Sequence, residues 1–404
     1  MPRVKRPLAK FRNHSGFILI LTSFLLGFSE FIIVGILDDI AASFPVDVST
    51  AGYLVTIFAL AYAISTPFVT TLIGRKRLLN VLLFLMSIFT IGNFVTAMAP
   101  TYAVLTLSRV VVAVVSGSGI SVIMAFATYL APMERRAWLI AWIFSGFSIA
   151  SVFGVPLGTF LSTQFGWRSA FYLIAGLSFI LLFFLKISLP DDLRQKSSGA
   201  TRFSDQLAIF KDPRIQLSAF VTMFSIAGIY AVYTYLRPIF STELGIAPSL
   251  VTLAFTAYGF MSLISNQLSG KIAERRGLLT MPKIYIAEIF LLGLLPVFLS
   301  ISWVGFLDLM LIGLTMYLLN SPIQLHMIGI AENSYPQSMV LASSFNSIFS
   351  NIGIAIGSAV GSQIAQNVGM QALGPGGAVL AAITLVLTLA LNHKNAQFTE
   401  SVET

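Results

Sequence analysis

Long apolar stretches separated by short polar ones run through almost the whole chain. An α-helix needs about 20 mostly apolar residues to cross the hydrocarbon core of a bilayer. Twelve stretches meet this length, at residues 16–37, 50–73, 79–98, 102–130, 138–162, 169–188, 215–240, 249–270, 281–301, 304–327, 339–366 and 374–392. Because they are long and evenly apolar, they predict helices rather than the alternating strands of a membrane barrel.

The composition supports a membrane protein and excludes several functions. Of 404 residues, 56% are hydrophobic and only 10% are charged, with a mean hydropathy of +0.88, whereas soluble domains carry about 25% charged residues. The chain has no cysteine, which excludes disulfides and thiolate metal ligands. The sequence shows no phosphate-binding loop, metal-ligand cluster or catalytic nucleophile, so we expect no cofactor, no metal and no enzymatic activity.

Basic residues lie at the N-terminus and in four alternate loops, those after the second, fourth, sixth and eighth predicted spans. They are Arg3, Lys5, Arg6, Lys10 and Arg12, then Arg75, Lys76 and Arg77, then Arg135 and Arg136, then Arg194, Lys196, Arg202, Lys211 and Arg214, and finally Lys271, Arg275 and Arg276. The first loop on the other side instead carries Asp38, Asp39 and Asp47. The positive-inside rule therefore predicts a multi-pass protein with both termini in the cytoplasm. The net charge of +8 reflects this topology rather than nucleic-acid binding.

The longest polar stretch divides the chain into two parts. Residues 189–213 fall between the sixth and seventh predicted spans. We therefore expect an N-terminal six-helix half at 1–188, a cytoplasmic linker at 189–213 and a C-terminal six-helix half at 214–404. A basic sequence that begins with glycine follows the second span of each half. Two six-helix halves related by an axis along the membrane normal form a transporter architecture.

These basic sequences resemble the loop motif of the major facilitator superfamily. In the second half the motif comprises Gly270, Glu274, Arg275, Arg276 and Gly277. The resemblance implies a network of acid and arginine side chains that latches the cytoplasmic side in one state. The first-half copy keeps Gly74, Arg75 and Arg77 but has Thr71 in place of the acid and Pro67 in place of the leading glycine. The alternative for the basic residues is simple positive-inside charge.

The fifth predicted span has a face of small residues. Gly146, Ala150, Gly154 and Gly158 recur every four residues, which lets another helix approach closely. Pro156 lies in the same stretch and removes one helical hydrogen bond. This segment resembles the antiporter motif of drug:proton antiporter families, with Val155 inserted between the glycine and the proline.

Glu30 is the main candidate for proton chemistry. It lies in the middle of the first apolar stretch, where a carboxylate is costly and by default faces the bundle interior or water. Asp38 lies roughly 12 Å further along that helix, and two acids at different depths suit a proton path. The alternative is a structural Glu30 satisfied by a polar neighbour, with Asp38 and Asp39 capping the helix end.

Arg109 in the fourth span is a second charge at membrane depth. A buried arginine stays protonated and needs a partner, and Glu30 is the natural candidate, although the sequence does not place the two together. Glu288, about one turn inside the ninth span, is expected to reach the cytoplasmic surface with its carboxylate. Asp308 is expected at the membrane interface.

Polar and aromatic side chains on several spans are candidates for a substrate cavity. They are Tyr62, Phe94, Tyr230, Tyr233, Asn320 and Asn346. The alternative for each is ordinary packing or a hydrogen bond between helices.

The first span after Glu30, the segment Gly166-Trp167-Arg168 and the segment from Tyr233 to Pro238 resemble bacterial sugar-efflux and arabinose-efflux-like permeases. The resemblance implies the major facilitator fold, a monomer in a bacterial cytoplasmic membrane, and export of a small amphipathic compound, a drug or a sugar-like molecule, in exchange for protons. A proton-independent facilitator or importer remains the alternative, followed by a non-transporting membrane receptor and a membrane-embedded enzyme.

Overall fold

The protein is described here by a computed structural model that covers residues 13–73, 76–130, 133–191, 193 and 207–403. Throughout this part of the chain, the elements are helices. Twelve described segments are long and apolar enough to cross a membrane: His14–Gly35, Val48–Pro67, Leu78–Met98, Tyr102–Ala127, Ser145–Phe165, Trp167–Ser188, Pro213–Tyr233, Pro248–Arg275, Gly277–Leu299, Ser302–Ser334, Ser344–Asn367 and Met370–Phe398. The prediction of an all-α membrane protein with twelve spans is confirmed.

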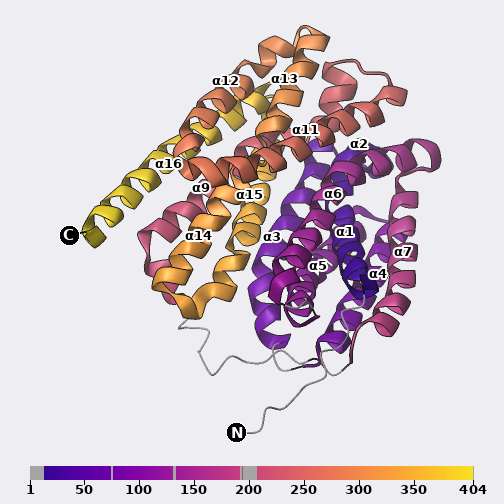
Figure 1. The fold of residues 1–404 in the computed structure, drawn as a ribbon. Coiled ribbons are helices and arrows are strands. Elements are labelled where there is room, and N and C mark those ends of the chain that lie inside the picture. The colour runs from indigo at the N-terminus through magenta and orange to yellow at the C-terminus, as the bar shows by residue number, and fades with distance from the viewer. Residues whose placement is uncertain (1–12, 74–75, 131–132, 192, 194–206, 404) are drawn as a thin grey trace.

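The first group of helices, named the N-terminal bundle, packs within itself. It comprises α1 (Asn13–Gly35), α2 (Leu37–Ser43), α3 (Val48–Ile73), α4 (Leu78–Met98), α5 (Tyr102–Leu130), α6 (Met133–Phe165) and α7 (Trp167–Ser188). In this bundle α1 lies along α6, while α4 lies along α5 and α7. Figure 1 shows the bundle in indigo and magenta.

The second group, named the C-terminal bundle, lies beside the first (Figure 1). It comprises η1 (Leu207–Lys211), α9 (Pro213–Tyr233), α10 (Leu236–Pro238), η2 (Ile239–Glu243), α11 (Pro248–Arg275), η3 (Gly277–Thr280), α12 (Met281–Leu299), α13 (Ser302–Thr315), α14 (Asn320–Ser334), η4 (Pro336–Ser338), α15 (Met339–Asn367), η5 (Met370–Ala372) and α16 (Leu373–Glu403). Two seams join the bundles, α3 against α15 and α6 against α11. Most of the expected linker, residues 194–206, lies outside the described residues.

The seventh span is shorter than the apolar pattern predicts, because of a proline. Residues 215–240 are apolar, but α9 ends at Tyr233. Pro238 has no N–H, and its ring would clash with the carbonyl of Thr234 in a continuous helix. The chain therefore turns at Thr234 and Tyr235 before the short helix α10. This turn lies at the end of the molecule that also holds α2, which we name the α2 end.

The tenth span is interrupted, although its sequence predicts one helix. Helix α13 ends at Thr315 and α14 begins at Asn320. Pro322 lacks the N–H that a continuous helix would need at that position. Two serine hydroxyls of α11 accept hydrogen bonds from freed backbone N–H groups, Ser265 from Tyr317 at 2.9 Å and Ser269 from Ser321 at 2.7 Å. A break inside a membrane is tolerated where such partners exist.

Two glycine faces bring helices into backbone contact. On α6, a Cβ at Gly146 would lie 2.6 Å from the carbonyl oxygen of Ile20 in α1. On α15, a Cβ at Gly357 would lie 2.8 Å from the Cα of Ala227 in α9. The same α15 face also carries Gly353 and Gly361, each against an α9 carbonyl. Small residues are typical of such contacts in membranes, because close packing is a main force that holds helices together there.

The substitution Gly357→Ala is expected to destabilise the C-terminal bundle. The added methyl collides with backbone that cannot rotate away, and overpacking of this kind costs about 1–3 kcal/mol. Thermal unfolding of the detergent-solubilised protein should show a lower Tm. Gly176→Ala on α7, where nothing lies within 4 Å of the new Cβ, is the matched control and should leave Tm unchanged or raise it. Equal Tm values for both variants would contradict the assigned contact.

Candidate functional site

A buried arginine forms the centre of the N-terminal bundle. Arg109 on α5 is fully enclosed. Its two terminal nitrogens donate to Ser29 of α1, at 3.0 Å to Oγ and 2.6 Å to the backbone carbonyl. Ser29 Oγ in turn donates to Asn93 Oδ1 of α4 at 2.7 Å, and the guanidinium lies 4.5 Å from the ring centre of Phe58. These contacts hold the positive charge against α1, one residue from Glu30.

Glu30 lies close to this charge without bonding to it. Its Oε2 is shielded from solvent and has no hydrogen-bond partner among the described residues. Glu30 and Arg109 interact electrostatically, but the ion pairs found in the described part of the chain do not include them. Arg109 is bonded to Ser29 at two nitrogens, whereas its Nε, like Glu30 Oε2, has no hydrogen-bond partner among the described residues.

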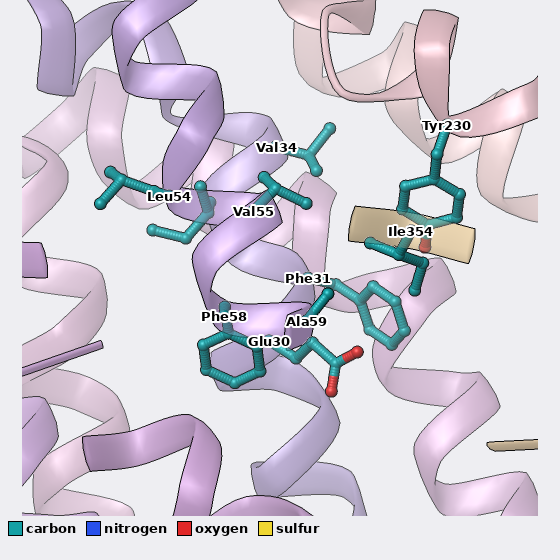
Figure 2. A pocket seen from close by; sticks show the side chains of 10 residues that line it. Glu30, Phe31, Val34, Leu54, Val55, Phe58, Ala59, Tyr230 and Ile354 are labelled. Carbon is teal, nitrogen blue, oxygen red and sulfur yellow. The ribbon is translucent and has the colours of Figure 1, made fainter. Parts of the chain in front are cut away.

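A small cavity borders Glu30 between the two bundles. It is lined by Glu30, Phe31, Ile33, Val34, Leu54, Val55, Phe58, Ala59, Tyr230 and Ile354. Figure 2 shows Tyr230 reaching the cavity from the C-terminal bundle, opposite the side chains of the N-terminal bundle. Its volume of about 10 Å³ is near the smallest space that holds one water. In this conformation the space admits water but no organic solute.

Four tyrosines of the C-terminal bundle, named the tyrosine cluster, face this region. The ring centres of Tyr230 and Tyr233 lie 5.1 Å apart, and those of Tyr233 and Tyr258 lie 5.4 Å apart. The fourth member, Tyr317, hydrogen-bonds with Tyr230 and also with Ser151 of α6, in the other bundle. Tyr317 was not among the residues predicted to line a substrate cavity. Pro322 was the available signal, because an interrupted span is typical of a transporter binding site.

Two other predicted cavity residues lie apart from each other. Tyr62 is buried on α3, close enough to Glu30 to interact electrostatically, and its hydroxyl bonds with Ser347 of α15 across the seam. Phe94 is 47% exposed on the outer surface of α4, where its ring packs against Tyr172 of α7. The structure therefore brings Tyr62 to the site and places Phe94 away from it.

The predicted asparagines do not line the cavity beside Glu30. Asn320 is the first residue of α14, directly after the break in the tenth span. Asn346 lies on α15, and its Oδ1 is buried without a hydrogen-bond partner among the described residues.

The predicted conformational motifs lie at helix ends and on the α6 face. Gly277 has a φ of +51°, the left-handed conformation that lets the chain turn between α11 and η3. Gly270 lies inside α11. Glu274 and Arg275 are exposed and form no ion pair within the described residues.

Arg77 is exposed at the start of α4, while Gly74 and Arg75 lie outside the described residues. The α6 face, which carries Gly146, Gly154, Pro156 and Gly158, packs against α1.

An ion-pair cluster joins the bundles at the α2 end. Arg237 of α10 donates to Asp39 Oδ2 of α2 at 2.5 Å and to the carbonyl oxygen of Gly35 at 2.6 Å. Its Nε lies 3.9 Å from Asp38 Oδ2, and Ser162 of α6 donates to Asp39 as well. The structure thus places Asp38 in this inter-bundle cluster, in the first turn of α2, beyond the end of the helix α1 that carries Glu30.

The two aspartates of this cluster differ electrostatically. Burial raises the pKa of Asp38, and the nearby Arg237 opposes this only in part. The Oδ1 of Asp38 has no hydrogen-bond partner in the described part of the chain, whereas Asp39 is directly bonded to Arg237. A group whose pKa rises on closure binds its proton more tightly in the closed form. Opening of this end would return Asp38 to water, so we predict that acidification favours closure through Asp38 and that rising pH disfavours it.

Comparison with known proteins identifies the family. The sequence profile of the Major Facilitator Superfamily matches residues 19–335, more than three-quarters of the chain. The chain belongs to the Major Facilitator Superfamily. Its relatives include the MFS-type transporter YtbD of Bacillus subtilis, which is 30% identical over 92% of this chain and 93% of that protein. A probable sugar efflux transporter of Helicobacter acinonychis is 27% identical over 91% and 93% of the two chains. The chain is therefore a membrane transporter of a small solute and not an enzyme.

Solved structures show the same fold. A bacterial homologue of the human lysosomal transporter Spinster, in an inward-facing and occupied conformation, aligns with a TM-score of 0.77 over 95% of this chain and 97% of its own, at 16% identity. A D-xylose-proton symporter aligns with a TM-score of 0.76 over 93% and 96%, at 15% identity. At these identities the likeness concerns the superfamily fold alone.

Substitutions of the two aspartates are expected to shift the balance between the open and closed forms of the α2 end in opposite directions. Asp39→Asn weakens the ion pair with Arg237 and should open this end, while Asp38→Asn removes a charge that closure buries and should keep it closed. Spin labels at Ala42→Cys on α2 and Thr242→Cys on η2 report the separation, because the chain has no cysteine of its own. The distances between the two labels, measured by double electron–electron resonance, should lengthen in Asp39→Asn only.

The pH dependence provides the control for this experiment. In the otherwise native double-labelled protein, the short-distance population should increase as pH falls, and Asp38→Asn should lack that increase. Identical distributions in both aspartate variants, at every pH, would contradict the assigned roles.

Proposed function

We propose that this transporter exports a small amphipathic compound in exchange for protons, by alternating access between the two bundles. The observation that carries the proposal is the position of Glu30. Its carboxyl has an oxygen with no hydrogen-bond partner among the described residues, borders the inter-bundle cavity, and lies near a guanidinium that is already bonded to Ser29. Acids at membrane depth are costly and mark ion pathways.

The proton acts through the charge of Glu30. When deprotonated, Glu30 is attracted to Arg109, and the two charges compensate one another. When protonated, Glu30 is neutral, and the charge of Arg109 is stabilised only by Ser29 and by the aromatic rings of Phe58 and Phe171. The two forms stabilise different arrangements of α1, so proton binding shifts the balance between inward-open and outward-open states. The seams α3–α15 and α6–α11 are the surfaces along which the bundles would rock.

The substrate class follows from the lining of the site. Apolar side chains dominate the cavity beside Glu30, and Tyr230, which hydrogen-bonds with Tyr317, lines it from the other bundle. Such a surface suits a compound with both apolar and hydroxyl or amine groups, a drug or a sugar-like molecule. The name of the Helicobacter relative, a sugar efflux transporter, favours the same class and the direction of export. The site must widen before this solute can enter.

Charge distribution supports an orientation in the membrane. Lys211, Arg214 and Arg276 lie at the end opposite α2, and acids cluster at the α2 end. By the positive-inside rule the α2 end faces outward and both termini face the cytoplasm of a bacterium. The Gly270–Gly277 turn then lies on the cytoplasmic side, where its charges are available to latch the bundles. The protein would act as a monomer.

Proton movement in liposomes tests this proposal. Purified protein is reconstituted with a trapped pH dye, and sugars and amphipathic drugs are added in turn. A true substrate should trigger proton flux, and Glu30→Gln should reduce that flux by at least tenfold, because the amide cannot exchange a proton at this depth. Glu332→Gln, an exposed acid on α14, is the matched control and should retain full flux.

The same assay distinguishes the alternative. If a labelled compound crosses the membrane without proton flux and Glu30→Gln transports it normally, the protein is a proton-independent facilitator and Glu30 is structural. The direction of net movement under an imposed pH gradient separates an exporter from an importer.

A further inference from the structure

A second carboxyl is enclosed in the C-terminal bundle. Glu288 of α12 is only 1% exposed, although the sequence predicted that it would reach the cytoplasmic surface. Its Oε1 approaches α9, 3.7 Å from the position of a Cβ at Gly228. This distance corresponds to ordinary van der Waals contact, so the carboxyl lies directly beside the α9 backbone at a position without a side chain. An ionised carboxylate in such a place has a high free-energy cost unless it is paired.

The hydrogen bonds around Glu288 can serve both its protonated and its ionised form. The side chain bonds with Thr315, the last residue of α13 before the break in the tenth span. The hydroxyl of Thr315 also lies 2.9 Å from the carbonyl oxygen of Ile312, which can only accept. The hydroxyl has one hydrogen, so it donates to Ile312 when the carboxyl is protonated and turns to the carboxylate when Glu288 is ionised. Oε1 has no partner within the described residues.

Among the described residues, Glu288 forms no ion pair. The titratable groups that interact with it electrostatically are Tyr258 of α11 and Tyr285 of α12. Tyr285 is itself bonded to Ser225 and Thr388. Helix α13 contributes an acid, Asp308, two turns before Thr315, and Lys283 of α12 is exposed. The basic residues of the other facing helices lie about 20 Å along them, at Arg214 of α9, Lys271 of α11, and His393 and Lys394 of α16.

We infer that Glu288 binds and releases a proton, and that it forms a second proton site separate from Glu30. The tyrosine cluster lies between the two carboxyls, because Glu30 interacts electrostatically with Tyr230 and Tyr317, and Glu288 with Tyr258. Each bundle thus contributes one acid to the same aromatic site. Loss of the proton places a negative charge beside Thr315 and draws its hydroxyl away from Ile312, which loosens the last turn of α13.

Proton binding by Glu288 does not depend on the proposed exchange, whereas its part in transport rests on that function. The first measurement is therefore independent of any substrate. Infrared difference spectra of the protein in lipid, recorded from acidic to alkaline pH, should contain a protonated-carboxyl band that disappears on deprotonation and is absent from Glu288→Gln. Asp308→Asn, Glu30→Gln and Glu332→Gln should keep that band, which assigns it to Glu288.

A second variant keeps the test decisive if Glu288→Gln folds poorly. Thr315→Val retains the carboxyl but removes its hydrogen-bond partner, so the band should remain and move to higher frequency. A carboxyl band that does not change with pH, or one unaffected by both Glu288→Gln and Thr315→Val, would overturn the inference.

The role in transport is measured as the number of protons exchanged per substrate. Glu288→Gln should lower this ratio by one while substrate exchange continues, and Glu30→Gln should abolish proton-driven movement. An unchanged ratio in Glu288→Gln would overturn the inference that Glu288 carries a second proton during transport. If no compound drives proton flux in the native protein, the exchange proposal fails, and the infrared titration still decides whether Glu288 binds a proton.

Discussion

The guanidinium of Arg109 cannot give up its proton, and it has no access to water inside the N-terminal bundle. It must therefore be satisfied by groups on neighbouring helices, and the structure uses the hydroxyl and carbonyl of Ser29 together with two aromatic faces. These contacts tie α5 to α1 at the depth of Glu30. In the proposed exchange the positive charge stays fixed in place, and the charge state of Glu30 is what changes.

In the C-terminal bundle, tyrosines and an interrupted span lie opposite this arrangement. Thr315 and Tyr317 lie at the break before Pro322, so the same few residues border both Glu288 and the aromatic site opposite Glu30. The serines of α11 that accept from the freed N–H groups make this break stable in lipid. Backbone contact between α9 and α15, through Gly357, supports a bundle that moves as a unit rather than by bending.

Much of the fold could be predicted from the sequence, because a bilayer imposes span length and internal hydrogen bonding on every apolar stretch. The twelve spans follow from this rule, while the end of α9 and the break before Asn320 depend on single prolines that a hydropathy pattern averages out. At the site, Glu30 and Arg109 stand out because charges are rare at membrane depth. The outward position of Phe94 on α4 and the enclosure of Glu288 depend on which neighbouring helices cover each face. The sequence does not indicate these neighbours, because hydrophobic periodicity is weak in helices that are apolar on every side.

The closure at the α2 end combines two kinds of contact. Arg237 joins the bundles by charge, whereas Tyr235 joins them through a buried hydroxyl, which donates to the carbonyl of Ser49 at 3.2 Å and lies 2.6 Å from Ser362 Oγ. Dissolved ions screen exposed charges over a Debye length of about 8 Å at physiological ionic strength, but they act little on a buried neutral hydrogen bond. Because the side chain of Arg237 is only 10% exposed and that of Asp39 32%, concentrated salt would weaken the ion pair in part and leave the hydrogen bond intact, so the hydroxyl of Tyr235 keeps the α2 end joined at high ionic strength.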